Sequence, residues 1–321
     1  MENNLLKLGK RPLIGDLKRD WQKYVMLSIP VLLVLVFSYL PMYGVLLVFK
    51  QYNVFKGFFA SPWIGFDNFV RVFSLPRFGK VVFNTLFLNL MGLATGFPLT
   101  IIFALAINEM KRPRIVRFIQ TVSYLPHFLS WVVIYGIFYQ LCAPRSGLLN
   151  QVVMNTMHIL GLSSGDISAT GLPFLTDKVW WVGTYLVSGL WEGIGWGSII
   201  YIATIAGVNP ELYEAAVVDG CNRWKKMWHI TLPSIKPTVV VMLVLSIGSI
   251  VSIGFEKPYL FSNPMVQDIG EVISTYVFNV GLGRGDFDAA NVVGLAQSVV
   301  SGILVITVNS IAKLLGEDGL W

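Results

Sequence analysis

The sequence predicts an all-α, multi-pass membrane helical bundle with six transmembrane helices. The chain is 55% hydrophobic and only 13% charged, whereas soluble domains carry about 25% charged residues. Six apolar stretches approach or exceed the roughly 20 residues that cross a bilayer. They are also too long and too uniformly apolar for barrel strands, and lipid requires internally bonded backbone, so helices are expected. The six stretches cover residues 24–49, 81–108, 118–142, 179–208, 238–255 and 289–312.

Lysine and arginine residues predict the orientation of this bundle. Fifteen of the 24 lie in the N-terminal segment, in the short loops after the second and fourth stretches, and near the C-terminus. The positive-inside rule places these parts in the cytoplasm, and therefore both termini. The predicted organisation is a basic cytoplasmic segment 1–23, a transmembrane domain 24–315 and a cytoplasmic tail 316–321. The net charge of +6 is thus a topology signal, and the basic residues form no single folded face that would bind nucleic acid.

The remaining loops are expected outside the membrane. Residues 50–80 hold several aromatic side chains, which favours a short amphipathic piece at the interface. Residues 143–178 include the run GLSSGDISATGLP and are expected to be mostly irregular. Residues 256–288 carry glycines around Arg284, which suits either a reaching loop or a solvated connector. Pro98 and Pro126 are expected to kink the second and third spans.

The most informative loop is polar and spans residues 209–237, with the sequence NPELYEAAVVDGCNRWKKMWHITLPSIKP. Asn209 is a suitable N-cap, and Pro210 suits the first helical position. Asp219 and Gly220 indicate a turn. A second helical run is then expected, closed by Pro233. The pattern predicts a helix-turn-helix at the membrane surface.

One face of the second helix is expected to dock against a partner. Its members share helical spacing, while the lysines lie elsewhere. They are Trp224, Met227, Trp228 and Thr231. Lipid contact is the alternative for this aromatic face.

This loop resembles the "EAA" motif of permease subunits of binding-protein-dependent, type I ABC importers. The motif residues are Glu214, Ala215, Ala216, Gly220 and Ile230-Thr231-Leu232-Pro233. Further stretches are similar to the polysaccharide and oligosaccharide branch of that family. They include YLPHFLSWVV, WEGIGWGSIIYIATIAG, FEKPYLFSNP and EVISTYVFNVGL. The resemblance implies a type I ABC importer permease fold in a bacterial inner membrane.

The resemblance also implies the partners and cargo. These are a sister permease subunit, two ATPase subunits that bind ATP-Mg, and an external solute-binding protein. The cargo would be oligosaccharides, and alginate oligosaccharides would make it acidic. Glu214 would meet a basic residue of the ATPase, and Gly220 would make the turn, with Ala215, Ala216 and Asp219 in the same coupling segment. In similar permeases the loop before the last helix reaches into the binding protein.

Glu192 lies near the middle of the fourth span. A carboxylate at the bilayer centre costs about 2.5–3.5 kcal/mol, so it should face a translocation pathway or a partner. Pathway lining, structural pairing with the sister subunit and a position nearer the membrane edge all remain open. Asn291 and Ser298 belong to a small, polar stripe on the last span, which suits either helix packing or pathway lining.

Several chemistries lack a sequence motif. The chain contains no Gly-x-x-x-x-Gly-Lys-Ser/Thr phosphate loop, so ATP is expected on a separate chain and no cofactor in this one. The histidines are far apart and no Cys-x-x-Cys occurs, which makes metal chemistry improbable. The rival functions are an ion-coupled secondary carrier, which would need no docking loop, and a membrane-embedded transferase, which would need a polar catalytic cluster.

Overall fold

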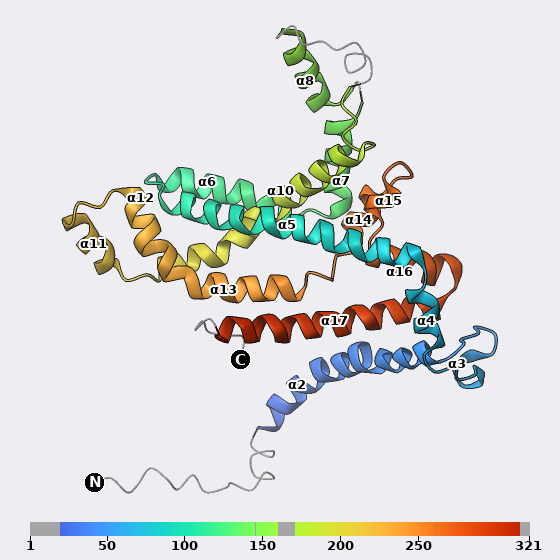
Figure 1. The fold of residues 1–321 in the computed structure, drawn as a ribbon. Coiled ribbons are helices and arrows are strands. Elements are labelled where there is room, and N and C mark those ends of the chain that lie inside the picture. Colours follow the sequence, from blue (N-terminus) through green and yellow to red (C-terminus); the bar gives the residue numbers. More distant parts are fainter. Residues whose placement is uncertain (1–19, 145, 160–170, 315–321) are drawn as a thin grey trace, which may run out of the picture. The chain divides into compact units, whose positions relative to one another are not determined.

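The computed structural model describes residues 20–144, 146–159 and 171–314. Within these residues the structure is helical, and an isolated antiparallel bridge between Lys50 and Trp63 is the one β-type pairing. The chain divides into two compact units, residues 1–68 and 69–321. Figure 1 shows the helices in chain order.

The described part of the first unit, residues 20–68, contains one membrane-spanning segment. Its helix α2 (Trp21–Val34) continues through a π-helical turn η1 (Leu35–Tyr39) and a 3-10 segment η2 (Leu40–Phe49). Together they form one apolar helix, Trp21–Phe49, long enough to cross a membrane. No side chain of α2 is buried within the chain, which suits a helix whose apolar surface meets lipid or another subunit.

The connection after this span is held by polar contacts to backbone carbonyls. Asn68 Nδ2 donates to the carbonyl oxygens of Val48 and Lys50 at 3.0 and 2.8 Å. Lys50 Nζ donates to the Phe58 carbonyl at 2.8 Å and lies over the Phe58 ring. The helices here are short, α3 (Gly57–Ala60) and the beginning of α4 (Asp67–Phe73).

The second unit holds the remaining helices. In chain order they are α5 (Pro76–Asn108), α6 (Pro113–Tyr124), η3 (Leu125–Phe128), α7 (Trp131–Cys142), α8 (Leu148–Ile159), α10 (Lys178–Ala206), α11 (Pro210–Val218), α12 (Arg223–Lys226), η4 (Met227–Thr231), α13 (Leu232–Gly248), α14 (Glu256–Phe261), α15 (Gln267–Gly270), α16 (Ile273–Arg284) and α17 (Phe287–Leu314). Helix α10 packs most extensively against α5, and α17 packs against α13 and α16.

The described residues contain five helices that are long and apolar enough to cross a membrane, or six if one bent pair counts as a single span. That pair is Pro113–Phe128 and Trp131–Cys142, bent by 106°. The expected kink of this span is therefore confirmed, and Pro126 lies in the 3-10 turn η3 that ends at the break. By contrast, α5 is an unbroken α-helix through Pro98.

Two sequence predictions require correction. Pro233 does not close the second helix of the 209–237 loop, because Arg223–Gly248 is continuous. The π-helical turn Met227–Thr231 precedes Pro233, and a widened turn absorbs the missing N–H and the ring clash that proline brings. Part of the expected irregular loop is the helix α8, and residues 160–170, which hold most of the Gly/Ser run, lie outside the described part. The loop 256–288 is largely helical, formed by α14, α15 and α16.

Two apolar clusters hold the second unit together. One lies where α5, α7, α10 and α14 meet, and it includes the fully buried Trp181, whose Nε1 donates to the Phe261 carbonyl at 2.9 Å. The other joins the opposite ends of α5 and α10 to α13, through Ala104, Tyr201 and Ile235. The space between the two clusters is where a cavity opens.

Candidate translocation cavity and coupling loop

Helix α11 begins as the sequence predicts. The Asn209 side chain accepts a hydrogen bond from the Glu211 backbone N–H at 3.0 Å, and Pro210 takes the first helical position. This satisfies one of the N–H groups that have no partner inside the helix. Asn222 caps the second helix in the same way, accepting from the Lys225 N–H at 2.9 Å.

The turn between the two helices requires Gly220. Its φ is +73°, a left-handed conformation that glycine adopts without steric cost. The Cys221 N–H donates to the Ala216 carbonyl at 2.9 Å across this turn. No heavy atom lies within 4 Å of a Cβ built on Gly220, so the requirement for glycine is conformational.

The two arms of the loop are tied together on one side only. Ala216 is buried, and the Tyr213 hydroxyl hydrogen-bonds to the buried Thr231 hydroxyl at 3.0 Å. Glu214, Ala215 and Asp219 are exposed on α11 and its end. Within the described residues Glu214 has no hydrogen-bond or ion-pair partner. The loop therefore presents an exposed carboxylate on a pair of capped, hydrogen-bonded helices.

The aromatic face of the second helix lies beside α5. Trp224 and Trp228 are 69% and 60% exposed. With Met227 they line a groove of about 650 Å³, whose other wall includes Ile101 and Leu105 of α5. Thr231 is buried, so the predicted four-residue docking face is exposed in part only.

A second concavity, of about 410 Å³, lies between α5, α10 and α13. Its wall is mixed: apolar side chains and glycines alternate with polar groups. The polar lining residues are Asn89, Thr95, Thr100, Tyr185, Tyr201, Ser246 and Lys257. Such a mixture of apolar surface and a few placed polar groups is typical of a small-molecule site.

Lys257 is the charged residue of this wall among the described residues. Its Nζ lies 3.9 Å from the ring centroid of Tyr185 and 5.0 Å from that of Trp131. Gly189 makes room for it, since a Cβ there would lie against Lys257 Nζ. Lys257 belongs to the short helix α14, outside the spanning segments, and burial lowers its pKa to about 7, opposed by the nearby charge of Glu192.

Glu192 is paired within this chain. Its Oε1 lies 2.8 Å from His127 Nδ1, and the His127 ring stacks on Trp196 with centroids 4.5 Å apart. His127 belongs to η3, where the bent span breaks. Of the alternatives left by the sequence, structural pairing has support here, but with a histidine of the same chain. A role of Glu192 in the pathway stays a prediction.

Close helix approach secures the same region. A Cβ on Gly195 would lie 2.1 Å from the Ser123 carbonyl oxygen. Glycine at this position thus lets α10 touch the backbone of α6.

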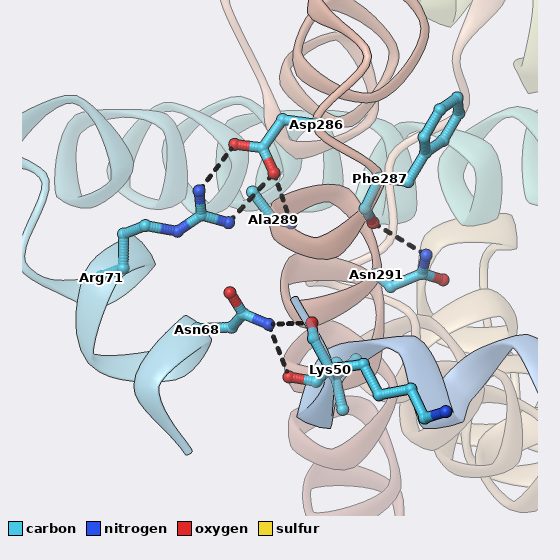
Figure 2. Close-up of polar contacts among 8 residues, drawn as sticks. Lys50, Asn68, Arg71, Asp286, Phe287, Ala289 and Asn291 are labelled. Carbon is cyan, nitrogen blue, oxygen red and sulfur yellow. Dashed lines mark hydrogen bonds and ion pairs between the residues drawn. The ribbon is translucent and has the colours of Figure 1, made fainter. Parts of the chain in front are cut away.

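The other two predicted pathway residues lie on α17. The Asn291 Nδ2 donates to the Phe287 carbonyl at 2.8 Å, and the Ser298 hydroxyl donates to the Gly294 carbonyl at 2.9 Å. Figure 2 shows the Asn291 bond. Neither residue lines the cavity between α5, α10 and α13, so their pathway role stays a prediction.

Ion pairs fasten the end of the second unit where α5 begins. Arg71 pairs with both Asp286 oxygens at 3.0 and 3.2 Å (Figure 2). Asp286 also accepts from the Ala289 N–H at the start of α17. Arg77 donates to both oxygens of Glu271 at 2.8 and 2.6 Å. Two-pronged pairs of this kind fix geometry as well as adding energy.

Sequence reasoning missed Lys257, His127 and Tyr185. The signal for Lys257 was available, because it stands directly after an apolar span, within FEKPYLFSNP. For His127, no local feature of the sequence indicates that it meets a carboxylate 65 residues away.

These features are a bundle of apolar helices around a partly polar cavity, with a polar loop of two capped helices. The chain belongs to the family of binding-protein-dependent transport system inner membrane components, whose model matches residues 96–317. It is a permease subunit of an ABC importer with the type I fold, and transport rather than catalysis is its role.

Curated relatives share nearly its whole length. Protein LplB of Bacillus subtilis is 39% identical over 96% of this chain and 93% of its own. The polygalacturonan/rhamnogalacturonan transport system permease protein YteP of the same organism is 37% identical, over 94% and 91%.

Solved structures agree. A chain of a bacterial alginate ABC transporter, in complex with an alginate pentasaccharide-bound periplasmic protein, matches with a TM-score of 0.84 and 36% identity over 97% of this chain and all of that one. A chain of a bacterial ABC transporter for the acidic polysaccharide alginate matches with 0.82 and 38%, over 94% and 98%.

Proposed function

We propose that this chain translocates oligosaccharides through the bacterial inner membrane, as one of two permease subunits driven by two ATPase subunits that bind ATP-Mg. An external binding protein delivers the cargo. Names of relatives that carry polygalacturonan, rhamnogalacturonan or alginate support the cargo class. Both termini and the 209–237 loop face the cytoplasm, as the distribution of lysine and arginine indicates.

The structure of the 209–237 loop is the main support for a coupling role. Two capped helices meet at a glycine with φ +73°, and they present Glu214 without a partner in the described residues. A rigid, charged element at the inner surface can transmit movement from an ATPase to the spans. Trp224, Met227 and Trp228 would add an apolar contact beside it. The cavity between α5, α10 and α13 would be part of the pathway, with Glu192, Asn291 and Ser298 as further polar groups along it.

Glu214→Ala tests this role in proteoliposomes that hold the complete importer. Removing one partner of a charged docking pair costs about 2–5 kcal/mol, so ATP-driven uptake should fall at least tenfold while membrane insertion stays normal. Glu211→Ala is the matched control, because Glu211 is an exposed carboxylate on the same helix outside the motif. Uptake by the chain without any ATPase would contradict the function, and full uptake by Glu214→Ala would contradict the coupling role.

A further inference from the structure

The cavity between α5, α10 and α13 has an unusual charge arrangement. Its walls come from three membrane helices, and their lining residues are uncharged in the described part of the chain. The charged lining residue is Lys257, which belongs to α14 and not to these three helices. A cation in such surroundings is costly unless it has a function or a compensating partner.

Contacts within the chain compensate Lys257 only in part. Two aromatic faces, of Tyr185 and Trp131, lie within 5.0 Å of Nζ. Cation–π contacts contribute about 0.5–2 kcal/mol. No carboxylate oxygen among the described residues lies within 4.0 Å of Nζ, and no hydrogen-bond acceptor is within reach. The ammonium therefore keeps its three N–H donors available toward the cavity.

The carboxylate of Glu192 is not a hydrogen-bonded partner of Lys257. Its Oε1 is engaged with His127 at 2.8 Å, and its influence on Lys257 is through charge alone. Lys257 Nζ occupies the space beside Gly189 that a Cβ at that position would fill. Geometry thus places Lys257 at the cavity wall beside Tyr185, without a hydrogen-bonded carboxylate among the described residues.

The neighbouring groups suit a sugar. Tyr185 offers a ring beside the ammonium, and sugar rings stack on aromatic faces. The Ser246 and Thr100 hydroxyls donate their protons to helix carbonyls, which leaves their oxygens as acceptors for sugar hydroxyls. A carboxylate is the group that would pair with the ammonium.

We propose that Lys257 is a specificity-determining residue that binds the carboxylate of an acidic sugar unit during its passage, with Tyr185 beside the ring. The ligand class is a uronic-acid-containing oligosaccharide. This inference rests on the proposed function, because it assigns the cavity to the pathway.

The test uses uronic-acid trisaccharides and the same trisaccharides with their carboxyl groups reduced to alcohols. Each is offered to the complete importer with its binding protein in proteoliposomes, and KM and kcat for uptake are measured. A charged hydrogen bond of this kind corresponds to about a 10- to 100-fold effect. Lys257→Gln should raise KM for the acidic trisaccharide by that factor and leave the reduced one unchanged, and Lys257→Arg should restore most of the acidic uptake.

Lys111→Gln is the matched control, since Lys111 is an exposed lysine between α5 and α6. Retention of the ATPase subunits during purification reports that each variant folds. The inference would be overturned if Lys257→Gln impaired uptake of both trisaccharides equally, or if it left KM for the acidic trisaccharide unchanged. It would also be overturned if the wild type took up only the reduced trisaccharide. Absence of ATP-driven uptake of any glycan by the wild type would instead contradict the proposed function.

Discussion

At the scale of single residues, the Glu192–His127 pair explains why a carboxylate is tolerated within a membrane helix. The two groups are 2.8 Å apart and partly buried, and Trp196 covers the imidazole ring. The pair links α10 to the 3-10 turn at the break of the bent span. One contact thus gives the carboxylate a polar partner and ties α10 to that break.

We expect the losses of stability caused by Glu192→Gln and by His127→Gln to be non-additive. If the pair acts as a unit, the double variant should be little worse than either single variant, with a coupling energy of about 0.5–3 kcal/mol. Thermal unfolding of the purified importer measures this. Additive losses of stability would show that the two side chains act independently. They would favour the alternative that Glu192 lines the translocation pathway.

Lys257 predicts a pH dependence of acidic-sugar uptake. Its pKa is lowered to about 7 by burial, so the ammonium is present below pH 7 and is lost as the pH rises above it. The groups that face it are Tyr185 and Glu192 of α10 and Trp131 of α7, and Glu192 is itself paired with His127. KM for a uronic-acid trisaccharide should therefore rise between pH 6 and pH 8.

Lys257→Arg tests whether Lys257 is the titrating group, because arginine stays protonated throughout that range. Uptake by this variant should show a flat KM from pH 6 to pH 8. The same pH slope in wild type and Lys257→Arg would assign the dependence to another group.

At the scale of elements, Gly195 sets the distance between α10 and α6. A Cβ at this position would lie 2.1 Å from the Ser123 carbonyl oxygen, a backbone atom that cannot move aside cheaply. Gly195→Ala should destabilise the subunit by about 1–3 kcal/mol, as overpacking does. Gly183→Ala is the control on the same helix, since a Cβ there meets no atom within 4 Å. Equal melting temperatures for the two variants would refute the close contact.

Some helices and breaks of this fold can be predicted from the sequence, and others cannot. Hydropathy predicts the long spans because lipid imposes a simple rule on every residue within them. Local chemistry predicts the Asn209 cap, the Gly220 turn and the break at Pro126, since each depends on near neighbours. Pro233 misled for the opposite reason: the π-helical turn before it changes the usual effect of proline. The helix α8 is hard to predict because it is only 12 residues long and a Gly/Ser run follows it in the sequence.

The candidate sites divide in the same way. The coupling loop follows from a compact motif whose residues are close in sequence. The cavity needs residues from α5, α10, α13 and α14, and Lys257 meets Tyr185 only through the fold. Sequence periodicity carries no information on such a meeting, so the pathway residues proposed from sequence differ from those that line the cavity.

At the scale of the whole molecule, the proposed topology predicts where its two cysteines can be reached. Cys221 follows the Gly220 turn and is half-buried, and Cys142 is buried at the end of α7. A membrane-impermeant maleimide should label Cys221 in inside-out vesicles and leave it unlabelled in right-side-out ones. Cys221→Ser in the inside-out vesicles gives the background. Labelling from the outer side would reverse the orientation inferred from lysine and arginine.

In the proposed importer, an ATPase subunit contacts the 209–237 loop at the inner surface and moves it during the ATP cycle. Val218, at the end of α11, is 87% exposed and can carry a photo-crosslinking side chain without disturbing the core. In the assembled importer, irradiation should join this position to the ATPase subunit, with a yield that changes between the nucleotide-free and ATP-bound states. A crosslink to lipid or to the external binding protein, with none to the ATPase in either state, would contradict the account.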